Sequence, residues 1–424
     1  MKFRLSVLLL LFLPMLLSAQ KKQKPLLLVN GGGMAGYSAA LQAAYSNVPT
    51  VLLIENLDDL EELKQARQQI SNKYQLDGGL WMSLLMDMAL SKTSSDSLAK
   101  VVKSDFNSQL AKNALEKLEV KLPNLTIYTG EKLIKCVKGK RNWTVTLSNR
   151  VKVSVPVLID GSADAVLIQE FSPEKRNLPQ SDFIAVKDLT LAQSRTVLAV
   201  GERNQEPVVA TLETILASEK DKLFDLAALR QLDNNPNELP LRMAFGQAVG
   251  ATAAYCAFFK AKAADIDLRK LQAELLAYKA RLNPYVDIAY TDPHFGSIQK
   301  FFLTGFFMDD KEGDALYFHP DAPVKFDDIK PVLNDVYTRS QLWFLDNYRN
   351  DDLTWKDLLS LIKFVSLKGD EVEQALRADW KTKRKFAGDF DLDAKITRRQ
   401  LAVMADLYSA SFAKAILPTG QFKK

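Results

Sequence analysis

The residues best suited to chemistry lie near the start of the chain, where glycines cluster. Asn30 is followed by three glycines, and the glycines at positions 31, 33 and 36 have the spacing GxGxxG. In a strand-turn-helix unit such glycines allow a tight turn, close approach of the backbone to a diphosphate, and close packing of helix on strand. Amide groups at the start of the helix then hold the phosphate charge. The candidate ligands of a dinucleotide are therefore Gly31, Gly32, Gly33, Met34, Ala35 and Gly36.

The segments around this turn predict the elements that must position it. Residues 25–29 are a short apolar run typical of a buried parallel strand, and residues 37–45 are small, apolar and compatible with a helix. A second apolar strand at 50–54 ends in Glu55, where an acid is expected to accept the ribose hydroxyls. The alternative is a glycine turn of an α/β fold that binds no nucleotide.

Composition excludes several other classes of protein. The chain has 424 residues and 47% apolar residues, enough for two or three domains with real cores. A net charge of +5 is too dilute over this length to predict a nucleic-acid partner. Two cysteines and two histidines exclude a disulfide scaffold and zinc fingers, and we expect no metal site. No catalytic residue is identified, and an acid or base before residue 290 must be a carboxylate, Lys, Tyr, Arg or a cofactor.

The first residues predict export. Residues 1–19 have the pattern of a secretory signal peptide, with Lys2 and Arg4 before an apolar run and a small-residue end at Ser18 and Ala19. A retained membrane anchor is the alternative, but the run is short for a spanning helix. We expect a periplasmic or extracellular, cell-envelope-associated protein with no membrane span after cleavage. Cys136 and Cys256 are expected to be free, buried thiols.

With these pieces in place, residues 24–290 resemble the FAD-dependent oxidoreductase family, which has a glutathione-reductase-type Rossmann fold. Further pieces match in order: strands at 124–129, 155–160 and 197–202, a helix at 242–254, and a closing segment from Asp267. The resemblance implies FAD as cofactor and hydride or electron transfer with an unknown small molecule. It also implies that the turn and Glu55 hold the ADP half, and that the flavin half lies along Ser162, Gly201, Glu202, Gly246 and Gln247.

Two departures from the family pattern bear on activity. Asn56 is followed by a charged stretch at 57–69, for which we expect a helix, where the family has a Gly-Gly pair; Gly78 and Gly79 are the displaced candidates. Only about 30 residues separate Asp160 from the strand at 197, where the family inserts a substrate domain. We therefore expect a reduced substrate region. The alternative function is a catalytically degenerate flavoprotein fold that acts as a scaffold or binding module.

Residues 291–424 have a different character, with amphipathic helices and acidic, proline-containing loops. The segment around 318–324, a fainter echo at 390–404 and a helical stretch at 353–380 resemble S-layer homology repeats. That resemblance implies attachment to a cell-envelope glycan or protein. The predicted architecture is thus an α/β, FAD/NAD(P)-binding Rossmann-like domain with a reduced substrate region, followed by an all-α C-terminal domain.

Overall fold

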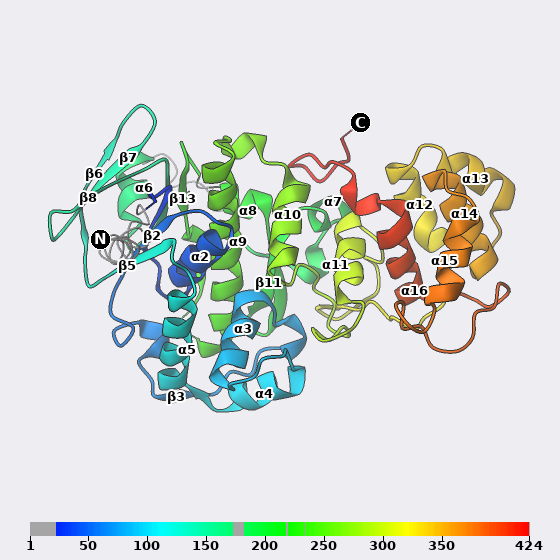
Figure 1. Cartoon of the computed structure of the whole chain (residues 1–424), viewed down its shortest axis with the longest axis horizontal. Helices are drawn as coiled ribbons and strands as arrows, with labels where there is room; N and C mark the ends of the chain where they lie inside the picture. Colours follow the sequence, from blue (N-terminus) through cyan, green and yellow to red (C-terminus); the bar gives the residue numbers. More distant parts are fainter. Residues whose placement is uncertain (1–22, 173–181, 218, 234, 424) are drawn as a thin grey trace, which may run out of the picture.

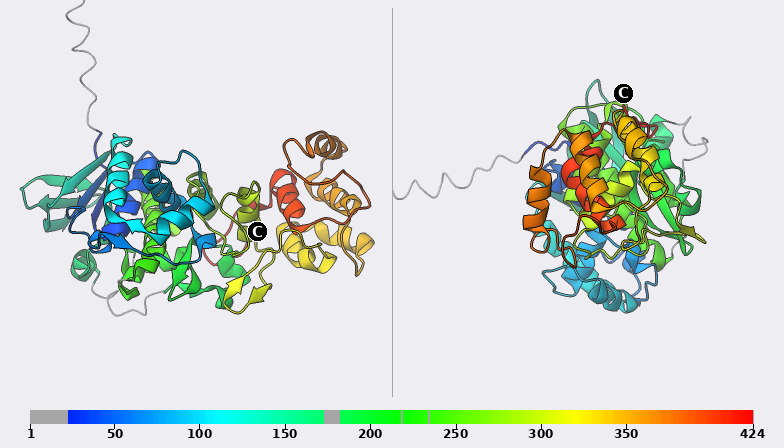
Figure 2. Two further views of the ribbon diagram at one scale, coloured as in Figure 1. Left: turned by 90° about the horizontal axis from the view of Figure 1, so that it is seen from below. Right: turned by 90° about the vertical axis from the view of Figure 1, so that its right-hand side faces the viewer.

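The computed structural model describes residues 23–172, 182–217, 219–233 and 235–423. The predicted signal peptide at 1–19 lies outside these residues. The molecule is elongated, with the C-terminal helices gathered at one end of the long axis and the α/β part making up the rest (Figures 1 and 2). No described helix has both the length and the apolar character needed to cross a membrane.

A parallel sheet of short, buried strands forms the centre of the α/β part. Its order is β13-β9-β1-β2-β5, and all its pairings are parallel. The strands are β1 (Leu27–Gly31), β2 (Thr50–Ile54), β5 (Leu125–Thr129), β9 (Val157–Gly161) and β13 (Leu223–Asp225). This order is that of a doubly wound Rossmann sheet, and it confirms the predicted fold class. The strands expected at 25–29, 50–54, 124–129 and 155–160 are confirmed within a few residues.

Two helices pack on this sheet and on each other more closely than side chains normally permit. Helices α2 (Gly33–Tyr45) and α9 (Leu239–Phe258) lie side by side. A Cβ on Gly246 would collide with the backbone of Ala35, and one on Gly250 would meet Ala39 one turn later. Glycine at these positions therefore lets the two helix backbones touch.

Helices α3, α4 and α5 lie below α2 and α9 in Figure 1, and α10 lies beside α9. Their bounds are Gly79–Met88, Asp96–Ser104, Ser108–Val120 and Leu268–Ala277. The charged stretch at 57–69 departs from the sequence prediction, because it contains only the short 3-10 turn η1 (Glu61–Leu63) and the two-residue strand β3 (Arg67–Gln68). Leu60 and Leu63 are buried, but Lys64 and Arg67, where an α-helix would continue the same face, are exposed charges, so the buried contact extends over one tight turn only.

Two antiparallel sheets of three strands flank the central one. The first is a meander with its own apolar cluster around Trp143 and Val145, built from β6 (Leu133–Lys138), β7 (Trp143–Leu147) and β8 (Lys152–Val155). The second has the order β10-β12-β11, with bounds Ile184–Ala185, Glu206–Thr211 and Val197–Arg203. The late strand predicted at 197–202 thus forms, but it pairs antiparallel with β12 instead of joining the parallel sheet.

Short helices α6 (Val166–Phe171), α7 (Leu191–Ser194) and α8 (Leu212–Leu216) connect these sheets. The C-terminal part begins with α11 (Phe295–Thr304) and a two-residue hairpin, β14 (Lys311–Glu312) with β15 (Ala315–Leu316). The remaining helices are α12 (Phe326–Val336), α13 (Ser340–Asn347), α14 (Trp355–Ser366), α15 (Glu371–Asp379) and α16 (Arg398–Met404). The helical stretch predicted at 353–380 is confirmed, with a break between α14 and α15.

Three loops of the C-terminal part close a ring of backbone hydrogen bonds. The Leu353 amide donates to the Val324 carbonyl at 2.7 Å, Ile396 donates to Leu353 at 2.9 Å, and Val324 donates to Ile396 at 3.3 Å. Each loop leads directly into a capped helix: α12, α14 or α16. The three loop-helix entries therefore have equivalent positions around the ring.

Both cysteines are free and buried, as predicted. Cys136 lies on β6 and Cys256 on α9, and burial raises the pKa of each thiol to about 12. Neither thiol is therefore ionised to a useful extent near neutral pH.

The contact of α2 with α9 gives a first prediction. Gly246→Ala should lower the free energy of unfolding by about 2–3 kcal/mol, because the added methyl overpacks a backbone contact. Gly296→Ala is the matched control, since a Cβ at that position of α11 meets nothing within 4 Å. Urea denaturation of both variants checks this, and equal midpoints for the two would contradict it.

Candidate functional site

The predicted glycine turn forms at the carboxyl end of β1. Gly31, Gly32 and Gly33 have φ angles of 70°, 96° and 55°, a left-handed run that side chains rarely permit. Gly36 packs beneath the carbonyl of Gly31, where a Cβ would collide with that oxygen. Gly161 at the end of β9 lies against the turn. The structure therefore gives these glycines the turning and packing roles that the spacing predicts.

A carboxylate lies over this turn. The Met34 amide, in the first turn of α2, donates to Oε1 of Glu62 at 3.3 Å. Both carboxylate oxygens come within 2.8 Å of the point that a Cβ on Gly33 would occupy. Because the start of a helix carries a partial positive charge, it favours an anion here. The Glu62 carboxylate stands in for that anion, so the turn fits a diphosphate once this side chain has moved aside.

Asp160 organises the neighbouring turn after β9. Its Oδ1 accepts hydrogen bonds from the Ser162 hydroxyl at 2.6 Å and from the Asn30 side chain at 3.4 Å. Its Oδ2 accepts the amides of Leu167 and Ile168, which lie in the first turn of α6. Ser162, predicted to lie along the flavin, is close to Gly31, and its hydroxyl binds Asp160 and the Val166 amide.

The strand beside β9 brings a second buried acid that the sequence reasoning missed. Asp225 ends β13, next to Asp160 in register. Arg230 forms a bidentate ion pair with Asp225 and also donates a hydrogen bond to the Ser162 carbonyl at 3.4 Å. Burial raises the pKa of Asp225, and the Arg230 guanidinium opposes that rise. Leu226, the next residue, packs against Gly32. The only sequence signal was a pair of apolar residues, Leu223 and Phe224, followed by Asp225.

The Gly78-Gly79 pair lies against α9. The Gln247 side chain accepts the Leu80 amide at 3.1 Å and donates to Gln42 of α2 at 2.8 Å. A Cβ on Gly79 would collide with that Gln247 side chain, and one on Gly78 would lie 2.7 Å from Cβ of Arg281. The displaced pair is therefore held between α9 and the segment that follows α10.

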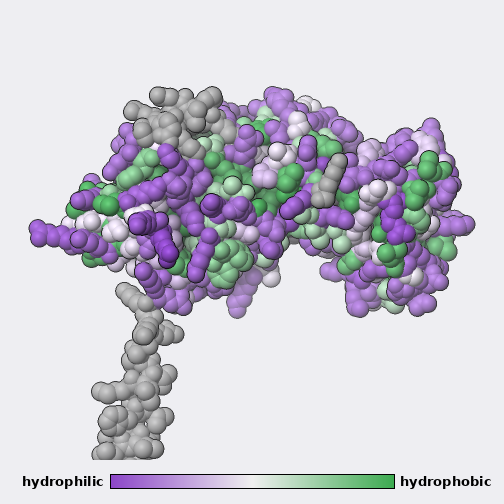
Figure 3. Space-filling model, turned by 90° about the horizontal axis from the view of Figure 1, so that it is seen from above, coloured by the Kyte–Doolittle hydropathy of each residue, from purple (hydrophilic) through white to green (hydrophobic). Residues whose placement is uncertain are grey.

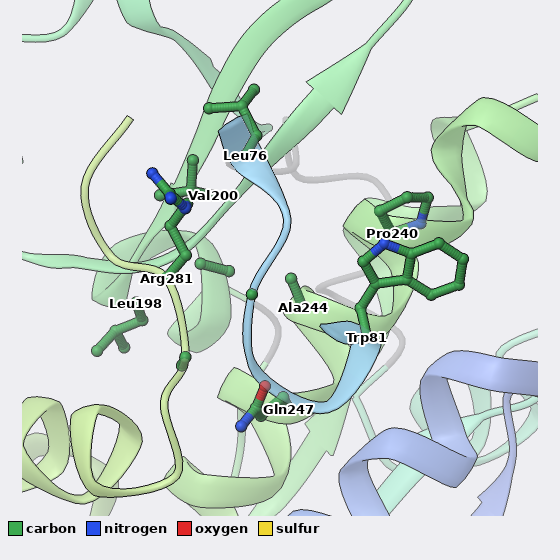
Figure 4. Close-up of a pocket in the computed structure, with 11 residues that line it drawn as sticks. Leu76, Trp81, Leu198, Val200, Pro240, Ala244, Gln247 and Arg281 are labelled. Atoms are coloured by element: carbon green, nitrogen blue, oxygen red, sulfur yellow. The ribbon is translucent and has the colours of Figure 1, made fainter. Parts of the chain in front are cut away.

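A small hollow opens beside this pair, with a cavity volume of about 10 Å³. Figure 4 shows Trp81 and Pro240 on one side of it and Arg281 and Leu198 on the other, with Gln247 at its base. This volume holds about one water molecule and is far smaller than a ligand pocket. The hollow therefore has no room for a substrate in this arrangement of side chains.

A buried ion pair involves Asp77, the residue directly before the Gly78-Gly79 pair. Asp77 accepts hydrogen bonds from Lys103 at 2.6 Å and from the Trp81 indole at 2.9 Å. Both charged side chains are almost fully enclosed. Burial raises the pKa of the Asp77 carboxyl, and the Lys103 ammonium acts against that rise. Arg281 donates to the Asp77 carbonyl, and burial lowers its pKa to about 10.

Of the other predicted site residues, Glu55 lies at the carboxyl end of β2, next to β1 and its turn, whereas those on β11 and α9 serve packing. Glu55 follows β2 directly and is exposed. Glu202 is buried on β11, where it accepts the Lys73 amide at 3.0 Å, and Gly201 packs on Leu241 of α9. Gly246 lies well inside α9, which begins at Leu239, so it packs on α2 rather than opening a helix.

Comparison with known proteins agrees with this geometry over the first part of the chain. Residues 27–170, about a third of the chain, match the family model described as FAD dependent oxidoreductase. This segment is therefore similar to FAD-dependent oxidoreductases, and the match indicates FAD binding. No curated protein matches the chain.

Solved structures match over a similar share. Bacillithiol disulfide reductase from Staphylococcus aureus is 18% identical over 32% of this chain and 38% of that one, with a TM-score of 0.23. Thioredoxin reductase from Lactococcus lactis is 14% identical over 32% and 35%, with a TM-score of 0.22. A flavin monooxygenase from Stenotrophomonas maltophilia is 14% identical over 32% and 38%, with a TM-score of 0.24. The chain thus covers little more than a third of each, and TM-scores this low carry no argument.

The buried ion pair gives a second prediction. Lys103→Met should cost about 3–5 kcal/mol of unfolding free energy, because it leaves the Asp77 carboxylate buried without its cation. Its stability should fall as pH rises through and above the ordinary titration range of a carboxyl group, since a raised pKa makes the folded state bind the extra proton. Urea denaturation across this pH range measures both effects.

Two further variants control this experiment. Lys103→Met combined with Asp77→Asn should recover part of the loss, because it removes the unpaired charge. Lys112→Met breaks a pair whose Asp58 side chain is 81% exposed, and should cost less than about 1 kcal/mol. A Lys103→Met variant as stable as Lys112→Met would contradict the assigned role.

Proposed function

We propose that this chain binds FAD through its glycine turn and uses it for hydride or electron transfer with a small-molecule substrate. One observation carries the proposal: three left-handed glycines form the turn at the start of α2, and an amide in the first turn of that helix already binds an anionic group. The family match over residues 27–170 supports FAD as the dinucleotide.

Each part of the site has a role in this proposal. The backbone of Gly31, Gly32 and Gly33 approaches the diphosphate, and the amide of Met34 offers it a hydrogen bond. Glu55, exposed where β2 ends, accepts the ribose hydroxyls. FAD supplies the redox chemistry when bound, while the protein orients it and limits access of water.

A test of FAD binding gives a third prediction. The purified chain should take up FAD to near-stoichiometric level and keep its visible absorption after desalting. Gly33→Ala should weaken binding about tenfold or more, because φ is 55° there and the new methyl occupies the approach to the turn. Gly388→Ala, with φ of 71° but open space around it, is the matched control and should bind normally.

The same preparation separates an active enzyme from a degenerate flavoprotein. An active enzyme bleaches with a reductant and recovers its colour with an electron acceptor or substrate. A protein that binds FAD but does not cycle is a scaffold that keeps only the cofactor. A colourless preparation that also fails to bind added FAD would overturn the proposal.

The C-terminal ring supports a second candidate function, attachment to a cell-envelope glycan or protein. Its three loop-helix entries have equivalent positions around the ring, which supports a part built from repeated helical units. The signal-peptide pattern at 1–19 supports the compartment that such a function needs, the periplasm or cell surface.

A sedimentation experiment gives a fourth prediction. The full chain should co-sediment with insoluble cell-envelope glycan, and soluble fragments of the same glycan should release it. Binding that follows only the net charge would be lost at high salt and would not respond to neutral fragments. A chain that stays in the supernatant at all ratios of glycan to protein would remove this candidate.

A further inference from the structure

The segment between Glu55 and the Gly78-Gly79 pair places an acid over the glycine turn. Within it, Leu60 and Leu63 are buried, and the short turn η1 between them packs against α2 and α5. Glu62 lies inside η1, and its carbonyl accepts a hydrogen bond from the Gln68 side chain at 2.7 Å. The backbone at Glu62 is thus fixed by two apolar anchors and one hydrogen bond.

The side chain of Glu62 is held less firmly than its backbone. It is only partly buried, and its contact in the structure is the Met34 amide at 3.3 Å, a long hydrogen bond. A change of rotamer can therefore move the carboxylate off the turn while Leu60 and Leu63 stay in place.

A diphosphate and the Glu62 carboxylate compete for the same position. The start of α2 favours one anion, and two anions at this distance repel each other. The carboxylate also lies where any group approaching Gly33 must pass. A ligand with a diphosphate therefore binds only the fraction of molecules in which Glu62 has turned away, and its apparent affinity falls by that fraction.

We propose that Glu62 is a built-in competitor for the diphosphate, an autoinhibitory contact that the cofactor must displace. This inference rests on the proposed function, because it assumes that the turn receives a dinucleotide. The inference assigns a role to the charged stretch at 57–69, which lies between Glu55 and the Gly78-Gly79 pair. The turn is closed to diphosphates at rest and opens by movement of one side chain.

Binding of ADP and of FAD to the full chain tests this inference. Glu62→Gln removes the charge at nearly constant size and should raise the affinity for both ligands about tenfold. Glu62→Asp, with a shorter reach, should give a smaller gain. Glu61→Gln is the matched control, because Glu61 is exposed, belongs to the same turn and pairs with Lys64. Calorimetry for ADP and fluorescence for FAD give the dissociation constants.

The two ligands separate failure of this inference from failure of the proposed function. If Glu62→Gln binds ADP more tightly but no variant binds FAD, the inference that Glu62 competes with a diphosphate is supported and the FAD proposal is overturned. If Glu62→Gln and Glu61→Gln each bind FAD and ADP with the same affinity as the wild type, Glu62 does not compete with the diphosphate. This result overturns the inference and leaves the proposal of FAD binding intact. If no variant binds ADP, the inference about Glu62 is also overturned, since removal of its charge then does not make the glycine turn accessible to a diphosphate.

Discussion

The close approach of α2 to its surroundings is the constraint on which the α/β part depends. Along one side, Gly36 lets the helix meet the turn after β1, and along another, Gly246 and Gly250 let α9 touch the backbone at Ala35 and Ala39. Without these glycines the sheet, α2 and α9 would stand further apart, and the amide of Met34 would point elsewhere. The same contacts leave little empty space at the centre of the fold, so any large ligand must enter from the edge of the sheet.

Sequence reasoning succeeded where a residue type has few possible uses. Consecutive glycines after an apolar run predict a left-handed turn and a helix, and the observed φ angles follow. Short apolar runs predicted most strands of the parallel sheet, because strands buried on both faces have no polar alternation. The free thiols could also be predicted, since Cys136 lies in a strand-like stretch and Cys256 in an apolar helical one, a pattern typical of buried thiols.

Contacts between distant segments could not be predicted in this way. Asp225 and Arg230 join the site only because β13 adds to the sheet beside β9, and the strand at 197–203 would serve equally well by composition. Glu62 looks like one acid among many in a charged stretch, and its role depends on the anchors Leu60 and Leu63. Lys103 similarly has the sequence surroundings of a surface residue, although it is buried with Asp77.

The ring of loops at 324, 353 and 396 has a consequence for how the C-terminal part comes apart. An open stack of repeats has terminal units, which fray singly because each loses one neighbour. A closed ring of three has no end, so release of any loop breaks two of the three hydrogen bonds and exposes both remaining partners. The three loops are therefore expected to open together, and the helices that begin at them to lose their entry positions in the same step.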